Sequence, residues 1–332
     1  MSETENSLQP RTNVLAYLLA PSAGQLLARI LACTLLLCVG CVGQPGPMDD
    51  DDAVGDDDDA VGDDDDTTSA PLVCNGHEAL CDLRLDQLVL PATHNSMSNA
   101  EDGWIAPNQQ VGLARQLEDG IRGMLLDTKE WNGDLYLCHG ACELGSILLD
   151  DALTILRDFM EDHPGEVVTL IFQDAITPAQ TAEAFERVGL TPLVYTHADG
   201  APWPRVGELV EEGTRLLVTA EAQGPPPAWY HHAWSLFQDT HYAFPDAASI
   251  HCDPNRGDAE NALFLMNHWV DGFLGIPVED DAAEANSASV LLAQVERCEE
   301  ERGVRPHLLA VDFYAVGDLF EVVDILNGVA DK

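Results

Sequence analysis

The sequence predicts an α/β protein whose body folds as a single (β/α)8-type barrel. Short apolar runs alternate with helical patterns along residues 74–332, and this alternation is typical of a mostly parallel sheet. The length of the stretch suits one barrel. A doubly wound sheet would give the same alternation, but no G-x-G-x-x-G turn follows the first predicted strand.

The predicted elements follow from the spacing of apolar residues. The expected strands are Gln87–Leu90, Gly123–Asp127, Asp134–Cys138, Val167–Phe172, Arg215–Thr219, Leu263–Asn267 and His307–Phe313. The expected helices are Gln109–Glu118, Ile147–Asp162, Pro178–Val188, Ala283–Arg302 and Gly317–Leu326. Residues 220–260 are rich in Pro and aromatic residues without a clear period, which predicts long loops near the top of the barrel.

The composition restricts the class of partner. The 332 residues include 58 Asp and Glu against 15 Lys and Arg, for a formal net charge of −43, and 46% of the chain is hydrophobic. That hydrophobic content excludes global disorder. Nucleic acid is not an expected partner, because phosphate binding requires clustered Lys and Arg.

Residues 1–41 resemble an export segment. The apolar run from Leu26 to Val42 ends in L-L-L-C-V-G-C-V, the pattern of a secretory h-region followed by a lipoprotein-type cleavage site with Cys41 as the acylated residue. We therefore expect an exported protein, either secreted or held at the cell envelope by a lipid anchor. An uncleaved anchor helix is the alternative, although the run is short for a membrane span.

Residues 42–73 contain three blocks of four Asp separated by Ala-Val-Gly. Such a segment has nothing to bury and its charges repel one another, so it is expected to be an extended, disordered linker. A metal-binding tract is the weaker interpretation, because a flexible run of Asp must be ordered before it encloses an ion.

Six cysteines follow Cys41, and an even number in an oxidising compartment predicts three disulfides. Among the fifteen pairings, we favour Cys74–Cys81, Cys138–Cys142 and Cys252–Cys298. A zinc site is the alternative, but the spacings give no pair of C-x-x-C knuckles.

Polar residues stand where five predicted strands end, the edge at which barrel enzymes carry their chemistry. They include two histidines and three aspartates, and a set of this size exceeds what loop solvation requires. The residues are His94, Asn95, Asp127, His139, Gln173, Asp174 and Asp312.

Two histidines across a pocket suit general acid–base catalysis near neutral pH, with Asp312 able to orient one of them. No G-x-S-x-G elbow supplies a nucleophile, but a phosphodiester whose own hydroxyl attacks needs none. Such chemistry needs positive charge at the phosphate. Lys129 is a candidate for it, and a metal held by Asn95, Asp127 and Asp174 is another. Glu221 and Asn267 are further candidate substrate contacts at strand ends.

Three segments, L-V-L-P-A-T-H-N-S-M-S, G-I-R-G-M-L-L-D-T and D-L-Y-L-C-H-G, resemble the X domain of phosphatidylinositol-specific phospholipase C, above all its secreted PLC-like phosphodiesterases. The resemblance extends from about Cys74 to Asn327. It implies an irregular TIM barrel in which His94 is the general base, His139 the general acid and Asp312 the partner of the base.

The same resemblance bears on cofactors. Calcium-dependent members carry two acidic ligands where this chain has Leu125 and Asp127, and a later ligand where it has Gln173 beside Asp174. Calcium-independent bacterial members carry an Arg at the position of Asp127. The chain matches neither scheme fully, so no cofactor is required by the sequence, and Ca²⁺ is the one that the resemblance allows.

The expected function is that of an exported, monomeric phosphoric diester hydrolase acting on a phosphoinositide-like lipid or its head group. Glycerophosphodiesters or sphingomyelin are alternative substrates, but enzymes for them usually need an E-x-D metal pair, and Leu125 replaces the Glu. A non-catalytic surface lipoprotein that binds inositol-type head groups or a protein partner is the other alternative. An acidic enzyme is also poorly attracted to anionic lipid surfaces.

Overall fold

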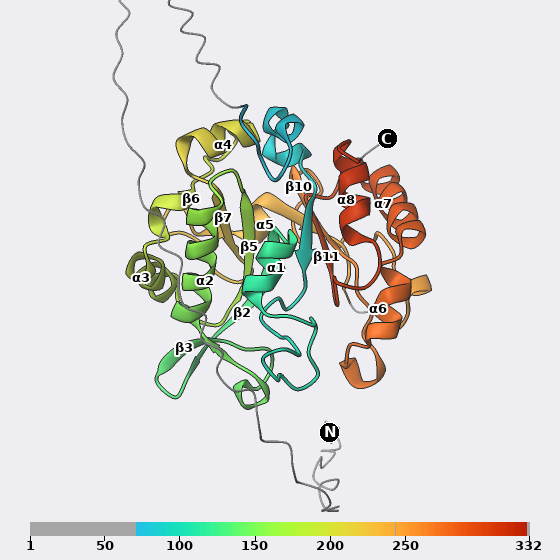
Figure 1. Ribbon diagram of the computed structural model, residues 1–332, viewed down its shortest axis with the longest axis horizontal. Helices are drawn as coiled ribbons and strands as arrows, with labels where there is room; N and C mark the ends of the chain where they lie inside the picture. Colours follow the sequence, from blue (N-terminus) through green and yellow to red (C-terminus); the bar gives the residue numbers. More distant parts are fainter. Residues whose placement is uncertain (1–70, 243, 331–332) are drawn as a thin grey trace, which may run out of the picture. The chain divides into compact units, whose positions relative to one another are not determined.

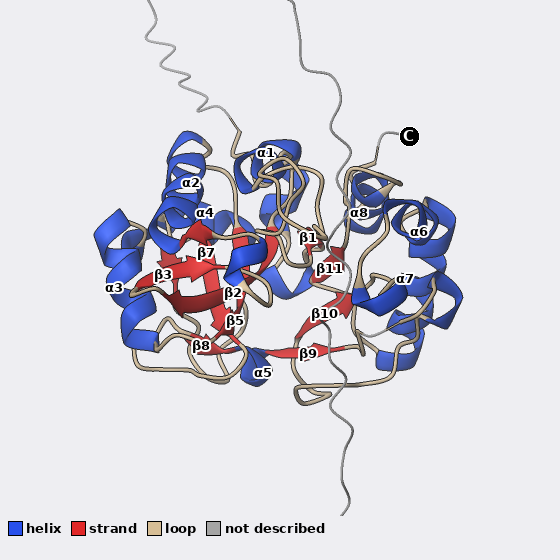
Figure 2. Cartoon of the chain, turned by 90° about the horizontal axis from the view of Figure 1, so that it is seen from below, coloured by secondary structure: helices blue, strands red, loops and turns tan. Residues whose placement is uncertain are grey.

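The computed structural model describes residues 71–242 and 244–330. The predictions for Cys41 and for the Asp-rich blocks therefore concern residues outside the described ranges. A curled, mostly parallel sheet forms the centre of the molecule, and helices cover its outer face (Figure 1, Figure 2). The α/β barrel-like fold predicted from the sequence is confirmed.

The sheet runs in the order β6-β7-β5-β2-β1-β11-β10-β9, and every neighbouring pair along this path is parallel. The short strands β6 and β8 both pair with β7, so they share one position in the ring. Among the described residues no pairing joins β9 to β6 or β8, which leaves the barrel open there. The strands are β1 (Leu90–Thr93), β2 (Gly123–Trp131), β5 (Val168–Asp174), β6 (Val194–Tyr195), β7 (Leu216–Ala220), β8 (His231–His232), β9 (Phe237–Asp239), β10 (Leu263–Asn267) and β11 (Leu308–Val311).

Helix α3 has the caps that its sequence suggests. Helix α3 begins after Thr177, whose hydroxyl accepts the Gln180 N–H in a capping box, and it ends at Gly189 in the left-handed conformation. The helices are α1 (Leu113–Asp119), α2 (Leu149–Asp162), α3 (Pro178–Val188), α4 (Val206–Glu212), α5 (Ala233–Leu236), α6 (Glu279–Ala285), α7 (Ala288–Arg302) and α8 (Leu319–Asn327). None of the described helices is long and apolar enough to cross a membrane.

Helices α1 and α2 begin later than expected, and four further expectations about the elements need correction. The first strand starts at Leu90 instead of Gln87, because residues Leu85–Gln87 form a 3-10 turn. The expected helix Ala283–Arg302 is two helices, broken where the buried Asn286 side chain turns to the backbone oxygens of Asp312 and Val316. Residues 220–260 contain β8, α5 and β9 as well as loops.

The fourth correction concerns Asp134–Cys138, which is not a barrel strand. Strand β3 (Asp134–Leu137) pairs antiparallel with the far half of β2, and β4 (Ile147–Leu148) pairs with β3. Strand β2 therefore extends beyond the barrel and the chain returns beside it as a hairpin, seen at the bottom of Figure 1.

Two apolar clusters occupy the two faces of the curled sheet. Met124, Leu126, Leu170 and Phe172 belong to the cluster between strands and helices, in contact with residues such as Leu153 of α2. The cluster on the concave face contains the alternate strand residues, including Leu90, Ala92, Ile171, Leu217, Leu265, Leu308 and Ala310. This period of two decides which side chains enter the barrel.

The barrel interior leaves little room at Gly123. A Cβ atom there would lie 2.6 Å from the Cβ of Ala92 and 2.7 Å from Cδ2 of Leu308. Only glycine therefore lets β2 approach β1 and β11 this closely.

All three predicted disulfides are present, each with its Cα atoms 5.1 Å apart. Cys74–Cys81 closes the loop around the first 3-10 helix, Cys138–Cys142 closes the loop after β3, and Cys252–Cys298 ties the β9–β10 connection to α7. Disulfides of this kind are typical of proteins in an oxidising compartment, which is consistent with export.

Candidate active site

The polar residues at the strand ends enter one cavity because they continue the inward-facing rows of the barrel. His94 stands two residues after Ala92, and Asp312 stands two residues after Ala310. The same spacing relates Asp127 to Leu125. A cavity of about 330 Å³ at this end is lined by His94, Asn95, Asn108, Leu125, Asp127, His139, Gln173, Glu221, Arg256, Asn267, Trp269 and Asp312, among others.

His94 is fixed on two sides. Its Nδ1 lies 2.9 Å from Oδ1 of Asp312, and its ring is stacked on the indole of Trp269 with centroids 3.8 Å apart and planes 5° apart. A carboxylate only accepts hydrogen bonds, so this contact places the proton on Nδ1 and leaves Nε2 as the basic nitrogen. An imidazole held in this way can accept a proton at Nε2.

The β2–β3 hairpin brings His139 to the same cavity. The Cys138 N–H donates to the backbone oxygen of Asp127 at 3.0 Å. His139, the next residue, therefore lies where the inner part of β2 ends. Burial lowers the pKa of His139, and the nearby His94 lowers it further. The Lys129 ammonium donates to the backbone oxygen of Gly140. Lys129 thus contacts the loop that carries His139 and does not line the cavity.

Burial raises the pKa of Asp127 to about 7, and the neighbouring Glu221 raises it as well, while His94 acts in the opposite direction. A carboxyl group with this pKa is about half protonated at neutral pH. Such perturbed groups are concentrated at functional sites, because the cavity that desolvates them also receives the ligand.

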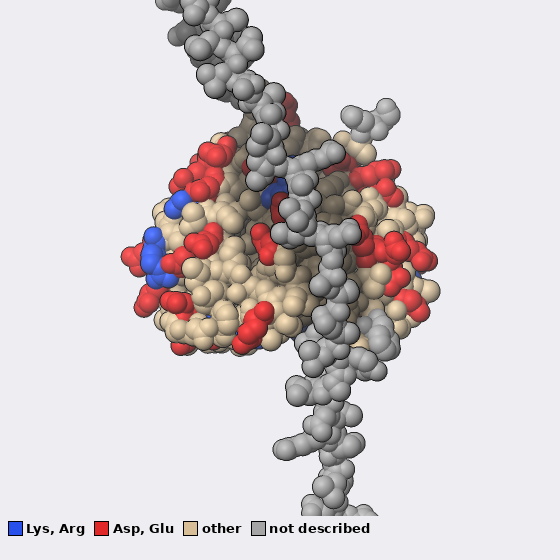
Figure 3. Space-filling view, turned by 60° about the horizontal axis from the view of Figure 1, so that its bottom comes forward, with Lys and Arg blue, Asp and Glu red and all other residues tan. Residues whose placement is uncertain are grey.

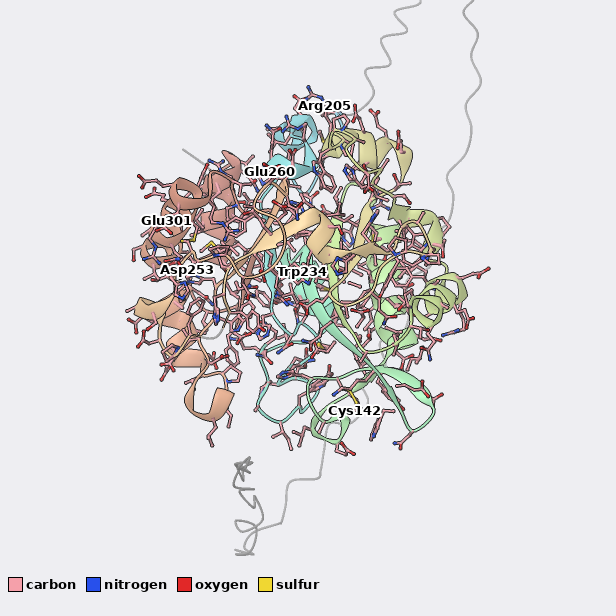
Figure 4. The ribbon with its side chains drawn as sticks, turned by 180° about the vertical axis from the view of Figure 1, so that it is seen from behind. Cys142, Arg205, Trp234, Asp253, Glu260 and Glu301 are labelled. Carbon is pink, nitrogen blue, oxygen red and sulfur yellow. A yellow bond between two sulfur atoms is a disulfide. The ribbon has the colours of Figure 1, made fainter. Side chains whose placement is uncertain are left out.

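The other end of the cavity is built around Arg256. Its Nη1 lies 3.0 Å from Oε1 of Glu221, and its Nη2 lies 2.6 Å from Oδ2 of the fully buried Asp239. The guanidinium lies 3.9 Å from the ring centroid of Trp234, a residue of α5 labelled in Figure 4, and 5.0 Å from that of Tyr242. Burial is the main cause of the raised pKa of Glu221, and Arg256 opposes it.

Asn267 completes this group of polar side chains. Its amide donates to Oδ2 of Asp239 at 3.2 Å and to the backbone oxygen of Thr240 at 2.7 Å. Its own Oδ1 is buried and has no hydrogen-bond partner among the described residues. The predicted substrate contacts Glu221 and Asn267 are therefore brought together, whereas Lys129 is not.

The predicted metal ligands do not converge. Asp174 shares the outward row of Leu170 and Phe172, so Gln173 enters the cavity in its place, and Oδ1 of Asp174 accepts the Ala222 N–H at 2.8 Å. The described residues contain no group of three or more His, Cys, Asp or Glu placed to hold a metal ion. Asn95 and Asp127 alone give fewer oxygen ligands than the six to eight that Ca²⁺ takes.

Several large apolar side chains are exposed on the molecule, and some of them stand beside the cavity. Leu274 is 81% exposed, and Ile276 and Val278 are also exposed on the connection after β10, whose Gly275 and Pro277 line the cavity. Ile105 and Leu144 are exposed on two loops joined by a backbone hydrogen bond. In the face that Figure 3 presents, acidic side chains greatly outnumber basic ones.

Sequence reasoning missed four residues of this site, namely Asn108, Asp239, Arg256 and Trp269. Asn108 and Arg256 lie in connections without periodicity. Asp239 ends the three-residue strand β9, and Trp269 stands shortly after the correctly predicted strand β10. Strand β9 is too short to give a periodic pattern, so Asp239 was not recognised as a residue at a strand end.

Fold and site together define an α/β barrel-like protein with paired histidines and carboxylates at the carboxyl ends of its strands. The family model PI-PLC X 1 matches residues 80–327. The chain belongs to the PI-PLC X domain family. Within it, a PI-PLC X domain-containing protein of Arabidopsis thaliana is 32% identical over 265 residues, which cover 71% of this chain and 61% of the relative.

Another relative agrees with this assignment, and a solved structure has a similar fold. PI-PLC X domain-containing protein 1 of Arthroderma benhamiae is 27% identical, with 79% of this chain and 92% of that protein covered. A variant of the phosphatidylinositol-specific phospholipase C from Staphylococcus aureus superposes with a TM-score of 0.50 at 14% identity, covering 75% of this chain and 93% of the enzyme. At this identity the last likeness shows the fold alone. An uncharacterized secreted protein of Arthroderma benhamiae is 28% identical.

Proposed function

We propose that the protein is an exported phosphoric diester hydrolase that cleaves a phosphoinositide-like diester by general acid–base catalysis. One observation carries the proposal: His94, held by Asp312 and Trp269, lines the same cavity as His139. Two imidazoles with different surroundings supply a base and an acid in one site.

In the proposed reaction the nucleophile comes from the substrate. A hydroxyl next to the phosphate attacks phosphorus and forms a P–O bond while Nε2 of His94 takes its proton. The P–O bond to the lipid alcohol breaks, and His139 donates a proton to the departing oxygen. The head group leaves as a cyclic phosphate, and no covalent bond to the protein forms.

The Arg256 end of the cavity favours a polyhydroxylated head group. The Arg256 guanidinium is already paired with Glu221 and Asp239. This end of the cavity can therefore offer hydrogen-bond donors and acceptors side by side without a large net charge. The unpartnered Oδ1 of Asn267 adds an acceptor. A ring with several hydroxyl groups would use such a set, with Tyr242 available as an apolar face.

The apolar rim supports a lipid as the source of the head group, because Leu274 and Ile276 could lie against acyl chains at an interface. The lipoprotein pattern at Cys41 would hold the enzyme at the envelope, and the acidic linker would space it from that surface. The net charge of −43 suits uncharged lipid surfaces better than anionic ones.

The test is a panel of phosphodiesters, including phosphatidylinositol, glycerophosphoinositol, phosphatidylcholine and sphingomyelin, assayed with EDTA and with added calcium. Phosphorus NMR identifies the product. We expect a cyclic phosphate from the inositol substrates and loss of turnover, by about 10²–10⁴-fold, in His94→Ala and in His139→Ala. His163→Ala, on the distant end of α2, is the matched control.

Turnover that survives in the double variant His94→Ala, His139→Ala would refute the proposal. Release of a free fatty acid, which would mean that an acyl ester and not the phosphodiester is cleaved, would do so as well. Binding of inositol head groups without turnover of any panel member would support the non-catalytic alternative instead.

A further inference from the structure

Asn108 is the neighbour of Asp312 that no catalytic scheme above uses. Its side-chain Nδ2 lies 3.1 Å from Oδ1 and 3.1 Å from Oδ2 of Asp312. Its own Oδ1 accepts a hydrogen bond of 3.3 Å from Nδ2 of Asn95. Asn108 is buried, with only 3% of its surface exposed, and the Asp312 side chain is 4% exposed.

The backbone fixes Asn108 in this place. Its N–H donates to the Ser98 oxygen at 3.0 Å, and its carbonyl accepts the N–H of Phe313 at 2.8 Å, directly after Asp312. The loop between β1 and α1 is thus tied to the end of β11 at the position of the carboxylate. Asn108 cannot shift without breaking these bonds.

The Asp312 carboxylate is in contact with both His94 and Asn108. Asp312 needs one oxygen free to accept from Nδ1 of His94, and rotation of the carboxylate about its side-chain bond would break that contact. The Asn108 amide holds both oxygens and opposes that rotation. Nδ2 of Asn108 also lies 3.4 Å from Nδ1 of His94, but two donors cannot bond each other, so its useful partner is the carboxylate.

We propose that Asn108 is a positioning residue for the general base: it holds the Asp312 carboxylate in the orientation that keeps the proton of His94 on Nδ1. The inference rests on the proposed function for its kinetic consequence, but the tautomer can be measured without any substrate. A residue that orients a ligand or base through a second group typically changes activity by about 10- to 100-fold when it is replaced.

The experiment uses the folded, exported chain labelled with ¹⁵N-histidine. Long-range ¹H–¹⁵N spectra report which ring nitrogen of His94 is protonated, and loss of the signal in His94→Ala assigns it. We expect an Nδ1-protonated ring in the wild type and a mixture of tautomers in Asn108→Leu. Asn108→Ser serves the same purpose if the larger replacement prevents folding.

Asn99→Leu is the matched control, because Asn99 is an equally buried amide of the same loop that bonds Met97 and Asp102 instead of Asp312. It should leave the His94 signal of the wild type. In kinetic assays, Asn108→Leu should lower kcat by about 10- to 100-fold with KM little changed.

Three outcomes would overturn the proposal: an unchanged His94 tautomer in both Asn108 variants, the same tautomer change in Asn99→Leu, or unchanged kcat. If the wild type cleaves no substrate of the panel, the proposed hydrolase function fails. The NMR result still decides whether Asn108 positions His94.

Discussion

The imidazole of His94 lies flat against the indole of Trp269, with ring centroids 3.8 Å apart and planes 5° apart. The stack fixes the plane of the ring, while Asp312 fixes its direction within that plane. Together these contacts leave the proposed general base little freedom to turn. Catalytic groups need such restraint, because small misplacements are costly in rate.

Replacing Trp269 with Leu should therefore lower kcat by roughly 10-fold or more, because the ring of His94 can then leave its productive plane. Steady-state kinetics on the substrate with the highest turnover measures the change. Trp203→Leu is a close control, since Trp203 stacks on His197 with the same 3.8 Å separation, at 6°, away from the cavity. Equal losses in the two variants would show that the effect is one of general stability.

The Cys138–Cys142 disulfide should matter more for activity than for stability. It closes the short loop that carries His139, and the stabilisation from a cross-link grows with loop length. Replacing both cysteines with Ser should lower kcat and change the unfolding midpoint little. The pair Cys252–Cys298 spans 46 residues and should show the reverse pattern. Thermal unfolding and steady-state kinetics on the two double variants test this prediction. A larger loss of activity in the variant without Cys252–Cys298 than in the variant without Cys138–Cys142 would contradict it.

Asp127→Asn should stabilise the fold at neutral and alkaline pH. The carboxyl group titrates near 7 in the folded state against an ordinary value of 3.8, so between these values the folded protein holds a proton that the unfolded chain has released. The free energy of unfolding of the wild type therefore falls as pH rises through this window. Asn does not titrate, so the free energy of unfolding of Asp127→Asn does not fall in this way as the pH rises.

The measurement is the melting temperature of both proteins from pH 4 to pH 8. The difference in favour of Asp127→Asn should be smallest at pH 4 and grow toward pH 8. A difference that stays constant, or that favours the wild type more at high pH, would mean that Asp127 does not carry the raised pKa. The pH 4 point serves as the internal control.

The apolar rim should govern attachment to lipid. Leu274→Ser combined with Ile276→Ser should weaken sedimentation with phosphatidylcholine vesicles and raise KM for vesicle substrate, because the variant removes apolar surface at the cavity mouth. Turnover of soluble glycerophosphoinositol should be unaffected. Ile325→Ser on α8 is the control, since Ile325 is also exposed but lies outside the cavity rim. Equal binding by all variants would remove the role assigned to the rim.

Much of this molecule could be predicted from local patterns. The spacing of apolar residues gives Pro178–Val188 as a helix with the observed bounds, and the same pattern locates β10. His94 and Asp312 were predictable because each directly follows a parallel strand, and the carboxyl ends of parallel strands meet at one edge. His139 was also predicted, but it is carried by the β2–β3 hairpin and not by the barrel strand that the sequence indicated. Two of the disulfide pairs were predictable from the short distance between their cysteines in the sequence.

Positions that depend on the alternation of side chains along a strand were harder to predict from the sequence. Gln173 and Asp174 both stand at the end of β5, and the choice of which enters the cavity requires the register of the whole strand against the inner cluster. A shift of one residue exchanges the two faces. The sequence left both residues as candidates, and the tertiary structure placed Gln173 inside.

The strand–helix alternation and most of the polar residues at the strand ends could be predicted from the sequence, because apolar periodicity and strand ends are local properties of the chain. The partners of those residues could be identified only in the folded structure. Asn108 reaches Asp312 across 204 positions, and Trp269 reaches His94 from another strand. Arg256 meets Glu221 and Asp239 from a loop without periodicity. Such contacts arise from the closure of the sheet around a shared cavity, which no local pattern encodes.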